Sequence, residues 1–265
     1  MAEALQYPFF QNALGGVLLG AVACGLIGSL VVVNRLSSLT GSVAHASFGG
    51  LGLSYLLGFN PLAGATLFSL GAALGTGALS LRQRERSDTA IAVFWAVGMA
   101  LGLVFISLSG GYAVDLMSYL FGSILTVAGT DLLLMAILDV VVVAFVAGLY
   151  KELLAISFDR EFSIIRGVRA DTIYMLFLCL VALTVVMLMR IAGLILVIAL
   201  LTIPAAVARL YVRGLGRMMA AASVLSALFG VTGLFVSWFL NIPSGASIIV
   251  VAGAVYGLAH ILRRG

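Results

Sequence analysis

The sequence predicts an all-α fold, a polytopic bundle of membrane-spanning helices in a single domain over residues 1–265. Two observations predict it. Of the 265 residues, 63% are hydrophobic and only 9% are charged, whereas a soluble domain carries about 25% charged residues. The apolar residues also form long runs, and about 20 of them suffice for one helix to cross the hydrocarbon. Such a chain must be solvated by lipid.

Nine apolar runs are candidate spans, and eight remains an alternative if one segment is re-entrant. The run at 42–57 is short and polar for a span. Thr202 and Pro204 are expected to interrupt the run at 191–209, either as a broken helix that marks a binding site or as a packing kink. Nine spans leave no room for a separate catalytic domain. The runs cover residues 13–33, 42–57, 62–80, 89–108, 131–149, 171–189, 191–209, 218–239 and 244–262.

The basic residues predict the orientation. All but one of the 14 Lys and Arg residues fall on one side of the predicted spans, and the other side receives only Arg190. Cytoplasmic loops carry the excess of basic residues, so the N-terminus is expected outside and the C-terminus in the cytoplasm. The net charge of +4 therefore reflects orientation in the membrane and does not indicate nucleic-acid binding. The stretch 109–129 is expected outside, with an apolar core too short to cross.

The longest polar stretch, residues 151–171, is expected to form a short helix lying across the cytoplasmic membrane face. Asp159 can cap this helix, Gly167 suits the position after its end, and Asp171 can cap the next span. Phe158 and Phe162 beside mixed charges suggest a protruding docking site for a partner protein. A helix that merely rests on lipid is the alternative.

This loop resembles the FDPE-type coupling segment of metal-type ABC permeases, the family that imports zinc, manganese or iron. Further stretches match the family's pattern in the same order, and the resemblance covers nearly the whole chain. The matching stretches are Gly28–Val32 with Arg35–Ser37, Ala44–Ala46 with Gly49 or Gly50, Tyr119–Leu125, Ile156–Phe162 with Gly167–Val168, Leu200–Ala206, and Pro243–Gly245.

The resemblance implies a multi-pass permease of a prokaryotic plasma (inner) membrane, with a fold similar to cobalamin-type ABC importer permeases. It implies a homodimer, a cytoplasmic ABC ATPase subunit and an extracytoplasmic metal-binding protein. ATP would be used by the partner subunit, so this chain would be no enzyme and would bind no cofactor, holding the metal ion only transiently. The implied ATPase-coupling residues are Phe158, Asp159, Arg160, Glu161, Phe162 and Gly167.

The resemblance also places the family's histidine at His45, three residues after Ser42 and on the same helix face. Many family members carry an Asp four residues before this histidine, and here that position is Gly41. Asp139, in the middle of a span, could replace the missing carboxylate or could pair within the protein. The residues predicted to line the metal-ion path are therefore His45, Ser42, Asp139 and Thr202.

Other functions remain open at this point. The same fold could import a metal chelate. An intramembrane enzyme would need a nucleophile with its base or a pair of aspartates, and Ser42 with His45 alone is not enough. A transporter driven by an ion gradient typically carries more acidic residues within the membrane than this chain does.

Overall fold

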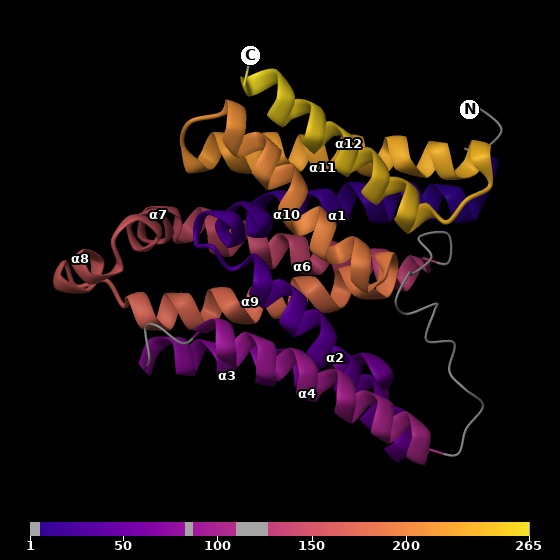
Figure 1. The fold of residues 1–265 in the computed structure, drawn as a ribbon, viewed down its shortest axis with the longest axis horizontal. Helices are drawn as coiled ribbons and strands as arrows, with labels where there is room; N and C mark the ends of the chain where they lie inside the picture. Colours follow the sequence, from indigo (N-terminus) through magenta and orange to yellow (C-terminus); the bar gives the residue numbers. More distant parts are fainter. Residues whose placement is uncertain (1–5, 83–86, 110–126, 265) are drawn as a thin grey trace. The chain divides into compact units, whose positions relative to one another are not determined.

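The computed structural model describes residues 6–82, 87–109 and 127–264, and every regular element in these ranges is a helix. The all-α prediction is thereby confirmed (Figure 1). The predicted outer motif Tyr119–Leu125 lies outside the described residues. The helices are α1 (Pro8–Val33), α2 (Ser37–Leu57), α3 (Pro61–Arg82), α4 (Ser87–Leu108), α6 (Gly129–Gly148), α7 (Tyr150–Phe158), α8 (Arg160–Ile165), α9 (Ala170–Ala192), α10 (Leu194–Tyr211), α11 (Leu215–Leu240) and α12 (Ser244–Arg264).

Eight of these helices are long and apolar enough to cross a membrane. The remaining long helix is α2, which has 21 residues but too many small and polar side chains to meet the same criterion. It begins at Ser37, whereas the sequence placed its start near residue 42. The difference arises because the first turn is polar, with the Thr40 hydroxyl donating to the Ser37 carbonyl oxygen at 2.7 Å.

The helices fall into two compact units. In the first unit, α1 packs on α6, α10 and α11, and α12 packs on α10 and α11. Close approach of helix backbones requires small residues at the contacts. A Cβ atom on Gly28 would lie 2.4 Å from the Leu201 carbonyl oxygen, and one on Gly25 would lie 2.5 Å from the Ser223 backbone nitrogen. Glycine at these two positions therefore lets α1 touch α10 and α11.

The second unit contains α2, α3, α4, α7, α8 and most of α9. Here α2 packs against both α3 and α4. Gly50 meets the backbone of Gly64 in α3, and Gly52 meets the backbone of Gly102 in α4. The glycine run Gly49-Gly50-x-Gly52 is thus a helix-packing surface.

The structure corrects two local predictions. The loop 151–171 forms two short helices, α7 and α8, instead of one, and Asp171 lies inside the first turn of α9 instead of capping it. In α10 the helix is continuous through Thr202 and Pro204, so the predicted broken helix is wrong, and the alternative, a packing kink, stays a prediction. Proline removes only one backbone hydrogen bond, and the rest of α10 remains helical.

Candidate ion path and coupling segment

His45 lies on α2 with its side chain half-buried. Its imidazole stacks on the indole of Trp95 from α4, with ring centroids 4.3 Å apart and an angle of 16° between the planes. The Nδ1 atom is buried and has no hydrogen-bond partner among the described residues. The stack orients the imidazole ring, and one ring nitrogen is left without a protein partner in this part of the chain.

Ser42 contacts the same neighbouring helix. Its side chain is fully buried, and its hydroxyl donates to the carbonyl oxygen of Ile91 at 2.8 Å. Ile91 and Trp95 are four residues apart in α4, so they lie on one helix face. Ser42 and His45 therefore both face α4. Ser42 links α2 to α4 by a hydrogen bond, and His45 stacks on Trp95. A role for Ser42 in the ion path stays a prediction.

The other two predicted path residues, Asp139 and Thr202, belong to the first unit. Asp139 is buried on α6, and neither carboxylate oxygen has a hydrogen-bond partner among the described residues. Thr202 is half-buried, and its hydroxyl donates to the Ile198 carbonyl oxygen at 2.7 Å within α10. Asp139 thus retains acceptor capacity, whereas the Thr202 hydroxyl is engaged by its own helix.

The predicted coupling segment, Phe158–Phe162 with Gly167, belongs to the second unit and is largely exposed. The side chains of Phe158 and Phe162 are 85% and 51% exposed. Asp159 caps α8 as predicted, because its carboxylate accepts from the Phe162 backbone N–H at 2.9 Å. Gly167 follows the helix end with φ +83°, a left-handed conformation that favours glycine. The Phe162 ring is therefore presented on the capped helix α8, whereas Phe158 is the last residue of α7.

Charged residues hold this segment in place. Arg160 forms an ion pair with Asp171 in the first turn of α9. The Arg166 guanidinium lies over the Phe162 ring, 5.0 Å from its centroid. Phe158, Asp159, Arg160 and Glu161 line a recess of about 420 Å³ together with Ser80 of α3. This arrangement offers a partner protein both apolar and charged contacts.

Two interactions in the structure were not predicted from the sequence. Trp95 was not recognised as the partner of His45, and the one available signal was an aromatic side chain in an apolar helix. Arg190, the one basic residue predicted outside, forms an ion pair with Asp131 at the start of α6, Nε to Oδ1 2.8 Å. Within the described residues, no group of three or more His, Cys, Asp or Glu side chains could hold a metal ion.

Comparison with known proteins gives matches over almost the whole chain. Residues 6–263 match the ABC 3 transport family. An uncharacterized membrane protein of Synechocystis sp. is 50% identical over 264 residues, covering 100% of this chain and 94% of that protein. The manganese transport system membrane protein MntC of Listeria monocytogenes is 33% identical, covering 97% and 91%. The solved structure of PsaBC from Streptococcus pneumoniae in complex with Fab gives a TM-score of 0.86 at 30% identity, covering 97% and 94%.

Proposed function

Because the chain belongs to the ABC 3 transport family and is a metal-type ABC importer permease, not an enzyme, we propose that its cargo is a divalent transition-metal ion. Among zinc, manganese and iron we propose manganese. The observation that carries this choice is the match over 97% of the chain to the Listeria protein named for manganese transport. Manganese also prefers oxygen ligands, and among the predicted path residues the Asp139 carboxylate has no hydrogen-bond partner within the described residues.

In this proposal two copies of the chain form the path, and a cytoplasmic ATPase subunit drives the cycle by ATP hydrolysis. A metal-binding protein delivers the ion on the outer side. His45 would contact the passing ion through an imidazole oriented by Trp95. Conduction requires binding weak enough to release the ion, and the absence of a carboxylate at Gly41 fits transient binding.

Uptake of radioactive manganese, zinc and iron tests the cargo and the site together. Cells expressing the permease with its ATPase and binding protein should take up manganese in preference to zinc and iron. His45→Ala should lower manganese uptake about tenfold, a loss of about 1.4 kcal/mol, while leaving the complex assembled. Ser54→Ala is the matched control in α2, because its buried hydroxyl donates only to Leu51 of its own helix, at 2.6 Å.

Normal manganese uptake by His45→Ala would refute the site assignment and leave the importer function standing. Preference for zinc or iron in the unmodified complex would refute the choice of manganese.

Coupling to the ATPase is tested separately at Phe162. Phe162→Ala removes an exposed ring from α8, and we expect it to reduce the ATPase that copurifies with the tagged permease. Exposed aromatic anchors of interfaces typically cost more than about 2 kcal/mol when truncated, which corresponds to a loss of more than tenfold in affinity. Phe239→Ala is the control, because Phe239 is also exposed but lies at the predicted outer end of α11. Equal recovery of ATPase with both variants would contradict the docking role.

A further inference from the structure

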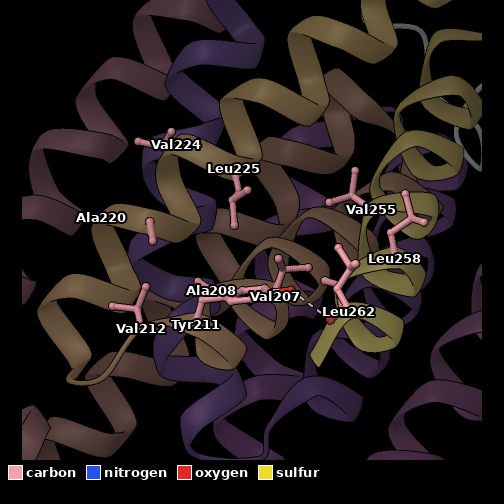
Figure 2. Close-up of a pocket in the computed structure, with 12 residues that line it drawn as sticks. Val207, Ala208, Tyr211, Val212, Ala220, Val224, Leu225, Val255, Leu258 and Leu262 are labelled. Carbon is pink, nitrogen blue, oxygen red and sulfur yellow. Dashed lines mark hydrogen bonds between the residues drawn. The ribbon is translucent and has the colours of Figure 1, made fainter. Parts of the chain in front are cut away.

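An apolar cavity of about 630 Å³ lies in the first unit where α10 ends, α11 begins and α12 ends. Figure 2 shows side chains from all three helices around it. Leu225 of α11 and Val255 of α12 line it, together with the exposed side chains of Val224, Leu258 and Leu262. Its volume falls within the range of about 300–1,000 Å³ typical of small-molecule sites. The exposed lining residues show that the cavity opens at the protein surface.

The cavity offers no free hydrogen-bonding side chain. Tyr211 is the one lining residue with a polar side chain, and its hydroxyl donates to the Ala259 carbonyl oxygen at 3.0 Å. The remaining lining residues are Ala, Val and Leu. An occupant must therefore be a hydrocarbon, because a polar group placed here would lose its hydrogen bonds to water without replacement.

Arginines surround the same end of the three helices. Arg213 directly follows the lining residue Val212, Arg263 follows Leu262, and Arg217 lies three residues before Ala220. These three arginines and Arg209 are exposed. Residues 187–265 contain no Asp or Glu, so no acidic side chain in this part of the sequence offsets their charge.

We propose that this cavity is a binding site for an anionic phospholipid, with an acyl chain in the cavity and the phosphate held by the arginines. Basic pockets between membrane helices on the cytoplasmic side bind anionic headgroups, and the basic residues predict that this end of α10–α12 is cytoplasmic. Hydrocarbon-only lining and an uncompensated positive rim together match the two parts of such a lipid. A partner protein that covered the apolar lining would also have to bring acidic residues to neutralise the four arginines.

Native mass spectrometry of the purified permease can test the site with phosphatidylglycerol and phosphatidylcholine as the two probes. The unmodified protein should retain phosphatidylglycerol about tenfold better than phosphatidylcholine. Arg213→Gln with Arg217→Gln should abolish this preference, and Ala220→Phe should prevent retention by filling the cavity from an exposed position. Arg169→Gln is the matched control, because it removes an exposed charge from the predicted cytoplasmic side of the second unit.

Equal retention of both lipids by the unmodified protein would overturn the proposal. So would unchanged retention in Ala220→Phe, which would indicate attraction of headgroups to surface charge alone. Loss of the dimer or of the ATPase in Ala220→Phe, with lipid retention intact, would assign the cavity to a protein partner instead. If the double variant fails to fold, Arg213→Gln alone replaces it, because Arg213 lies in the exposed connection between α10 and α11. This single variant should weaken the preference for phosphatidylglycerol.

Discussion

Helices α2 and α4 pack against each other in the same unit, yet they have opposite character. The α2 sequence is rich in Gly and Ser, and Leu39 to Gly52 is buried almost without interruption. The α4 sequence is strongly apolar, but only 17% of its most apolar stretch is buried. The more polar helix is therefore the interior one, and the more apolar helix faces outward.

This contrast follows from the solvent. Lipid tails are as apolar as leucine, so burying leucine inside a membrane protein gains little, and small residues that allow close backbone packing take the interior positions. Ala46 and Gly52 of α2 each meet a glycine of α4, Gly98 and Gly102. Hydropathy therefore detects α4 as a span and overlooks α2, although α2 packs against both α3 and α4.

The largest effect should come from a charge on the outward face of α4. Val97 is 49% exposed near the middle of this helix. Val97→Lys should reduce the yield of inserted protein, since a charge at the centre of a membrane helix costs about 2.5–3.5 kcal/mol on insertion scales. Val97→Leu is the control, and membrane-fraction yield is the measurement. Normal insertion of Val97→Lys would mean that this face meets water or a polar partner instead of lipid.

A smaller but clear effect is expected from a single methyl group inside α2. A Cβ on Gly50 would lie 1.9 Å from the Gly64 carbonyl oxygen, and this backbone atom cannot move without shifting α3. Gly50→Ala should lower the stability of the purified protein by about 1–3 kcal/mol, the usual cost of overpacking. The control is Gly71→Ala in α3, where a Cβ would meet no atom within 4 Å. Thermal unfolding in detergent compares the two variants, and equal stability would show that α2 and α3 pack less closely.

The same contrast explains which features could be predicted from the sequence. The α4 and α12 helices begin and end within about two residues of their predicted bounds, because apolar runs flanked by polar residues mark the limits of a span. The start of α2 was missed because its first turn carries hydroxyls. The shared face of Ser42 and His45 follows from helical spacing.

The partners across the helix contact could not be predicted in this way. Spacing along α2 does not indicate which residue of another helix lies opposite, so the stacking of His45 on Trp95 required the three-dimensional structure. The cap at Asp159 is a local pattern and was predicted correctly. The pairing of Asp171 with Arg160 joins two different helices and was not predicted.

The smallest effect concerns the hydrogen bond between α2 and α4. Ser42→Ala removes the hydroxyl that donates to Ile91, and hydrogen bonds between membrane helices contribute about 0.6 kcal/mol on average. We expect a slight fall in thermal stability, well below that of Gly50→Ala. The Ile91 carbonyl belongs to the backbone of α4, and Ser42→Ala leaves the helical structure of α4 in place. Ser54→Ala, which breaks only a bond within α2, should have no larger effect. Measuring manganese uptake by the same variants separates two roles for Ser42. A fall in uptake no greater than the slight loss of stability would mean that Ser42 fastens α2 to α4, whereas a tenfold fall with stability retained would place its oxygen in the ion path beside His45.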